Sequence, residues 1–87
     1  MNREKLKILM TVAVSKALDY QKIKTGADVE ETFQHIMKEI PARGKEKAAA
    51  IAAVDKAMQY KELEKIKDRQ ILQRVMNELD VLIDNLE

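Results

Sequence analysis

The sequence has no cysteine, and glycine, proline and aromatic residues are rare among its 87 positions. Without cysteine the chain can form neither a disulfide nor a cysteine-based nucleophile or zinc site. The aromatic side chains are two tyrosines and one phenylalanine. Runs of β-branched residues, which are typical of strands, are also absent. These absences indicate an all-α protein.

Neither glycine nor proline occurs between Lys45 and Glu87. These are the residues that most often interrupt helices, so no local signal ends a helix in this run. An unbroken helix there would be about 64 Å long at roughly 1.5 Å per residue. The 44 residues before it could hardly cover such a rod. The run must therefore bend back on itself or pack against another chain.

Long hydrophobic runs are missing as well. The longest uncharged segment, from Ile8 to Ser15, is too short to cross a bilayer and has no small-residue cleavage site after it. We therefore expect no membrane segment. The lack of cysteine fits a cytoplasmic location, which is the location that we predict.

The apolar 46% of the sequence comes mainly from alanine, leucine, isoleucine, valine and methionine. Alanine, leucine and methionine, with the abundant lysine and glutamate, are strong helix formers. We therefore expect one helical domain over residues 1–87, a small three- or four-helix bundle with a long C-terminal helix. The apolar spacing predicts helices over residues of about 2–24, 28–40, 45–60 and 61–86.

The predicted first helix is apolar around most of its circumference, which places it at the centre of the fold. Its clearly polar strip includes Thr11 and Ser15, which we expect on the outer side. Asp28 is the predicted N-cap of the second helix, and Pro41 should end that helix. The many alanines of the third helix should allow a neighbouring helix to approach closely.

The last two predicted helices can be separate or fused. Their apolar residues lie on nearly one side of a continuous helix, but an apolar trio between them points the other way: Tyr60, Leu63 and Ile66. Either the helix breaks between about Tyr60 and Asp68, or one long helix serves partners on opposite sides. With no glycine or proline to support a turn, the continuous or gently bent helix is the preferred prediction. The trio would then form either a core contact, which is favoured, or an exposed contact patch.

The C-terminal stretch carries leucines at coiled-coil spacing over barely two heptads. Together with the surplus of apolar helix surface, this spacing predicts self-association, most simply a homodimer through the C-terminal helix. The candidate protein-contact residues are Tyr60, Leu63, Ile66, Leu72, Leu79, Leu82 and Leu86.

Net charge is only +1, but bases and acids are concentrated at opposite ends. Residues 1–24 carry six bases and two acids, whereas residues 78–87 carry four acids and no base. The six bases are Arg3, Lys5, Lys7, Lys16, Lys22 and Lys24. These ends could pair when their helices lie antiparallel, or could steer one subunit onto another.

The residues that could carry chemistry are few. Glu31, His35 and Glu39 share one face of the second predicted helix, but carboxylate-bridged metal sites in bundles need a second Glu-x-x-His motif that this chain lacks. A solvated face with local charge pairing explains the trio better. No phosphate-binding loop or nucleophile motif is present. We therefore predict a non-enzymatic protein with no cofactor and no metal site.

By elimination, the predicted function is protein–protein interaction: a small adaptor, regulator or inhibitor that binds itself and another protein through an exposed helical face. The alternative is a nucleic-acid-binding regulator. It would use a basic face of the first helix with Arg43, Lys45 and Lys47, where the free amides and dipole of a helix N-terminus attract anions. This alternative predicts retention on heparin that falls steeply with salt.

Overall fold

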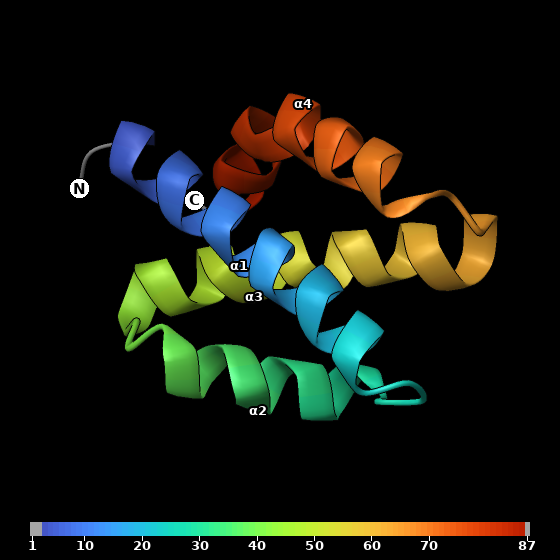
Figure 1. The fold of residues 1–87 in the computed structure, drawn as a ribbon. Helices are drawn as coiled ribbons and strands as arrows, with labels where there is room; N and C mark the ends of the chain where they lie inside the picture. The colour runs from blue at the N-terminus through green and yellow to red at the C-terminus, as the bar shows by residue number, and fades with distance from the viewer. Residues whose placement is uncertain (1–2, 87) are drawn as a thin grey trace.

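A computed structural model describes residues 3–86 and shows an all-α fold without strands in that range (Figure 1). The small helical bundle predicted from the sequence is confirmed. The predicted start of the first helix at residue 2 lies outside the described residues. The elements are α1 (Arg3–Ile23), α2 (Val29–Glu39), α3 (Gly44–Gln59), the π-helical turn η1 (Tyr60–Glu64) and α4 (Asp68–Leu86).

Helix α1 lies at the centre, as its apolar circumference predicts. It crosses α3 diagonally and packs against it most extensively, with α2 on one side and α4 on the other (Figure 1). Its buried residues are Leu6, Met10, Ala13, Val14, Ala17 and Leu18. Both helices bury several alanines in the shared core, so the two helices that pack most extensively are also the two with the smallest buried side chains.

Helix α2 begins and ends where the sequence predicts. The carboxylate of Asp28 accepts a hydrogen bond from the Glu31 amide at 2.8 Å, which caps the first turn. Ile40, the residue before Pro41, has extended backbone geometry and ends the helix. The buried hydroxyl of Thr32 donates to the Asp28 carbonyl at 2.9 Å, so this polar group is satisfied within the core.

The prediction of one continuous helix over residues 45–86 is wrong. Helix α3 ends at Gln59, the chain widens into η1, and Lys65 adopts the left-handed region with φ 52°. The break falls within the interval that the two-helix alternative specified. It reverses the chain, so α4 returns along α1 and α3 (Figure 1).

Burial of α4 explains why the chain turns at a lysine. The stripe of α4 that faces α1 and α3 is almost completely buried: Ile71, Val75, Leu79 and Ile83. Each such side chain contributes about 1.5–3 kcal/mol when fully buried. One lysine in the left-handed region costs only about 1–2 kcal/mol. The reversal is therefore favourable although no glycine is present.

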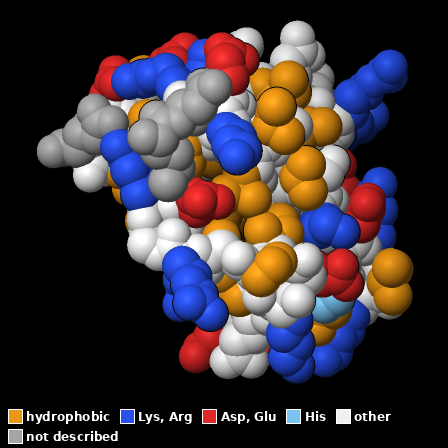
Figure 2. Space-filling view, turned by 90° about the vertical axis from the view of Figure 1, so that its left-hand side faces the viewer, with side chains coloured by type: hydrophobic (Ala, Val, Ile, Leu, Met, Phe, Trp, Pro, Cys, Tyr) orange, Lys and Arg blue, Asp and Glu red, His pale blue; other side chains and the backbone are white. Residues whose placement is uncertain are grey.

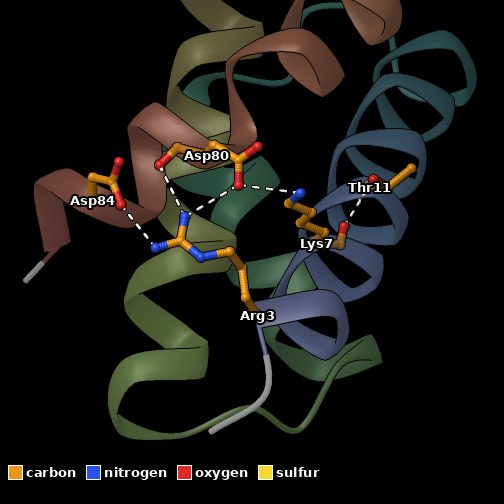
Figure 3. Close-up of polar contacts among 5 residues, drawn as sticks. All are labelled: Arg3, Lys7, Thr11, Asp80 and Asp84. Atoms are coloured by element: carbon orange, nitrogen blue, oxygen red, sulfur yellow. Dashed lines mark hydrogen bonds and ion pairs between the residues drawn. The ribbon is translucent and has the colours of Figure 1, made fainter.

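Ion pairs tie the start of α1 to the end of α4 (Figure 3). The Arg3 guanidinium contacts Asp80 at 3.1 Å and Asp84 at 2.8 Å, and the Lys7 ammonium contacts Asp80 at 3.1 Å. Hydrogen bonds donated by Lys7 and Arg3 lower the pKa of Asp80, and the hydrogen bonds that Arg3 donates to Asp84 and Asp80 raise the pKa of Arg3. The opposite charges of the two termini thus pair within one subunit, because α1 and α4 are antiparallel. Arg3, Asp80 and Asp84 are exposed and Lys7 is only partly buried, so the pairs fix orientation more than they add stability.

Tyr60 joins η1 to α4. Its hydroxyl donates to the Glu78 carboxylate at 2.7 Å, and Lys56 and Arg74 approach its ring at 5.4 and 5.5 Å. The hydrogen bond to Glu78, followed by burial, raises the pKa of Tyr60 from 10.0 to about 12. Loss of the proton would place a phenolate against a carboxylate, so the folded protein retains the neutral phenol.

We expect this interaction to make the fold sensitive to alkali. The unfolded chain loses the Tyr60 proton near pH 10, whereas the folded chain loses it at about 12. The contribution of Tyr60 to the free energy of unfolding is therefore complete below pH 10 and falls as the pH rises toward 12. Phenolate absorbance of the Tyr20→Phe variant, in which Tyr60 is the only tyrosine, should report this titration. A midpoint near pH 10 while circular dichroism shows a folded protein would contradict the expectation.

Candidate protein-docking face

Of the seven predicted contact residues, only Leu63 projects far into solvent, with 80% of its surface exposed. Two of the others are buried in the core, Tyr60 and Leu79. Four are partly buried against that core: Ile66, Leu72, Leu82 and Leu86. The apolar stripe of α4 is thus used mainly inside the subunit. A homodimer through α4 stays a prediction, with Met76 and Val81 as the large apolar side chains that α4 leaves exposed.

The polar strip of α1 does not face outward, contrary to the expectation from its sequence. The Thr11 hydroxyl donates to the Lys7 carbonyl at 2.8 Å and is half-buried, and Ser15 lines a hollow together with Asp68 and Leu72 of α4. This strip lies beside α4, and the Lys7 and Lys22 ammonium groups on it pair with carboxylates of α4. An apolar strip of α1 therefore turns toward solvent.

The outward strip carries Ile8, with 64% of its surface exposed, and Val12, with 40%. We call these two residues the docking ridge. Exposure of large aliphatic side chains to water is unfavourable, and sequence periodicity did not reveal that these two are exposed together on the central helix. The signal was available in the width of the apolar arc of α1, which exceeded what three short neighbours could cover.

A hollow lies on each side of the docking ridge. The hollow toward α4 has a volume of about 400 Å³ and is also lined by Lys7, Thr11, Met76 and Leu79. The hollow toward the α2–α3 loop has a volume of about 430 Å³, and its apolar lining includes Leu9, Ile40 and Pro41. Figure 2 shows hydrophobic side chains gathered on one face of the molecule, with charged side chains around them. A ridge between two grooves is the surface that an additional helix packs against.

Most bases of α1 are engaged by carboxylates of their own subunit. Besides the pairs in Figure 3, Lys16 contacts Glu39 at 3.3 Å, Lys22 contacts Asp68 at 3.6 Å and Lys24 contacts Glu31 at 2.8 Å. Lys5 alone among the six makes no ion pair within residues 3–86. The basic face that the nucleic-acid alternative requires is therefore largely neutralised.

The anion-contact candidates lie together at the start of α3. Arg43 is the N-cap residue and makes no side-chain capping bond, Lys47 is exposed, and Lys45 is half-buried. Glu46 is interleaved with them and also exposed. Binding of an anion there stays a prediction.

The trio on α2 lies along the edge of α1 instead of facing open solvent. The His35 ring stacks on Tyr20 of α1 with centroids 4.1 Å apart, and its Nε2 atom is 3.7 Å from Glu39. Glu31 pairs with Lys24, the residue that follows α1. The trio thus helps to hold α2 against α1. Between residues 3 and 86, no three histidine, cysteine or acidic side chains are grouped so that they could hold a metal ion.

Comparisons with models of protein families, with curated proteins and with solved structures found no match for this chain. Among the described helices none is both long and apolar enough to span a membrane. The docking ridge and its two hollows are the surface feature that bears most directly on function.

Proposed function

We propose that the protein is a non-enzymatic protein-binding module, a small adaptor, regulator or inhibitor that docks through the outward face of α1. The observation that carries the proposal is the exposure of Ile8 and Val12 between two largely apolar hollows. The other apolar side chains of α1 are buried or partly buried by its neighbours, except Ile23 at the end of the helix, which is 86% exposed but lines neither hollow. Contact of such a contiguous apolar surface with water is unfavourable, and a partner that covers the surface lowers the free energy.

The lining of the hollows supports a protein partner more than a small polar substrate. Binding sites for small molecules combine apolar walls with a few convergent polar groups. In the hollow toward α4, the two polar residues are already occupied: Lys7 by Asp80 and Thr11 by a backbone carbonyl. What remains free is aliphatic surface, which suits aliphatic side chains of another helix. The proposal keeps the cytoplasmic location expected from the sequence.

Site-specific photo-crosslinking in the native host tests this proposal. A photoreactive residue at Ile8 should give covalent adducts of higher mass, because the docking ridge lies within a contact. The matched control is the same residue at Glu62, an exposed polar position on η1. A third position, Leu63, tests the contact patch predicted from the sequence. Adducts at position 62 that equal or exceed those at position 8 would overturn the proposal.

A further inference from the structure

We infer that the docking ridge binds a second copy of this chain, whose α1 lies antiparallel across it about a two-fold axis at Val12. The inference rests on the proposed function and specifies its partner. It starts from three residues of α1 at equal spacing: Lys5, Val12 and Asp19. Seven residues advance a helix by about 20° less than two full turns, so all three lie on one side of α1, roughly 10 Å apart along its axis.

The two charges on this side are unsatisfied. Lys5 and Asp19 are exposed, and neither makes an ion pair with any residue of the described range 3–86. The other bases of α1 all contact carboxylates of their own subunit. Along this side of α1, Lys5 is a base without an ion pair, Val12 is an aliphatic centre and Asp19 is an acid without an ion pair.

Such a surface is complementary to itself in one orientation only. A two-fold axis at Val12 places Lys5 opposite the partner subunit's Asp19 and Asp19 opposite the partner subunit's Lys5. In a parallel pair, Lys5 would face the partner subunit's Lys5 and Asp19 would face the partner subunit's Asp19, so like charges would repel. Isologous contacts of this type are the commonest in homo-oligomers, and charge patterns of this type set helix orientation.

The apolar centre fits the same arrangement. Val12 meets the partner subunit's Val12, and Ile8 lies opposite the partner subunit's Lys16, whose ammonium is held by Glu39 and whose aliphatic stem is free to pack. Ile8 therefore meets the partner's hollow toward the α2–α3 loop, which Lys16 lines. Two such aliphatic residues per subunit make a small contact, below the roughly 800 Å² per partner of a stable interface. We therefore expect a dimer with a dissociation constant in the micromolar range or weaker.

Sedimentation equilibrium of the purified protein from micromolar to millimolar concentration tests the inference. The Val12→Asp variant should weaken dimerisation by about a hundredfold or more, because it places two carboxylates in the apolar centre. Val12 is partly exposed, so the variant should stay folded, and circular dichroism checks this. The control is Val81→Asp on α4, which should leave this dimer unchanged but would weaken the alternative dimer through α4 that the sequence predicts. Weakening by Val81→Asp without weakening by Val12→Asp would overturn the inference.

Charge reversal tests the antiparallel register directly. Lys5→Asp and Asp19→Lys should each weaken dimerisation by about threefold to tenfold, since each turns two attractive pairs into repulsive ones. The double variant should restore it, and so should an equal mixture of the two single variants. If the double variant and the equal mixture dimerise as weakly as the single variants do alone, this register is overturned.

The outcomes separate this inference from the proposed function. A species of 10.0 kDa at every concentration, with adducts to another protein at Ile8, overturns the inference alone. A protein that is monomeric at every concentration and gives no adducts at Ile8 overturns both the inference and the proposed function. Adducts at Ile8 with twice the mass of the chain, together with the charge-reversal pattern, support both.

Discussion

Replacing Ile71 by alanine is expected to lower the free energy of unfolding by about 2–5 kcal/mol. Ile71 is fully buried near the start of α4, which packs on both α1 and α3. Alanine would leave a cavity at the first buried residue of α4 after the chain reversal. A domain of this size has a total stability of about 5–15 kcal/mol, so the change removes a large part of it. Urea denaturation followed by circular dichroism measures the loss.

The matched control is Val81→Ala on the same helix. Val81 has 58% of its surface exposed, so its replacement should change the free energy of unfolding by less than about 0.5 kcal/mol. A comparable loss in both variants would mean that α4 does not pack as described. A loss of less than 1 kcal/mol at Ile71 would mean that burial of α4 does not drive the chain reversal.

Local signals in the sequence predicted the parts of the fold that local chemistry determines. Asp28 caps α2 and Pro41 ends it, because each acts within one helical turn. The central position of α1 was also predictable, since apolar residues around a helix require several neighbours. The pairing of N-terminal bases with C-terminal acids followed from their opposite signs once two helices lay antiparallel.

The break after α3 could not be predicted in the same way. Asp68, a possible N-cap, is the one local residue that favours it, and Lys65 in the left-handed region is locally unfavourable. Its cause is the burial of Ile71 and Ile83 of α4, a helix that packs against α1, which is distant in the sequence. The free energy gained from packing against residues distant in the sequence cannot be recognised from one or two helical turns of sequence. The absence of glycine and proline therefore led to the wrong prediction of a continuous helix.

The candidate site was missed for a related reason. Periodicity showed that α1 has a wide apolar arc, but not which part of the arc its neighbours leave open. The side that carries Thr11 lies beside α4, where Lys7 pairs with Asp80. Burial of the rest of the apolar arc against three helices leaves Ile8 and Val12 exposed, so the packing of α1 determines which apolar residues are available for docking.

The second large effect is expected for Ala53→Leu, which should lower the free energy of unfolding by about 1–3 kcal/mol or more. Ala53 is fully buried on α3, where α1 contributes Ala13 and Ala17 with equally small side chains. Leucine and alanine are both good helix formers, so the helix itself loses little. The added carbons must instead force α1 and α3 apart, and α1 carries α2 and α4 with it because it packs against both. Thermal and urea unfolding measure the change.

The control is Ala48→Leu, the same substitution at an exposed position of α3. It adds the same carbons to the same helix without a facing neighbour, so stability should change by less than about 0.5 kcal/mol. If both variants are as stable as the parent protein, α1 and α3 do not pack closely through their alanines. If Ala53→Leu alone is destabilised, close approach of these two helices holds the core together. The same variant should also weaken the proposed dimer, because displacement of α1 moves the docking ridge relative to Met76 and Pro41, which line its two hollows.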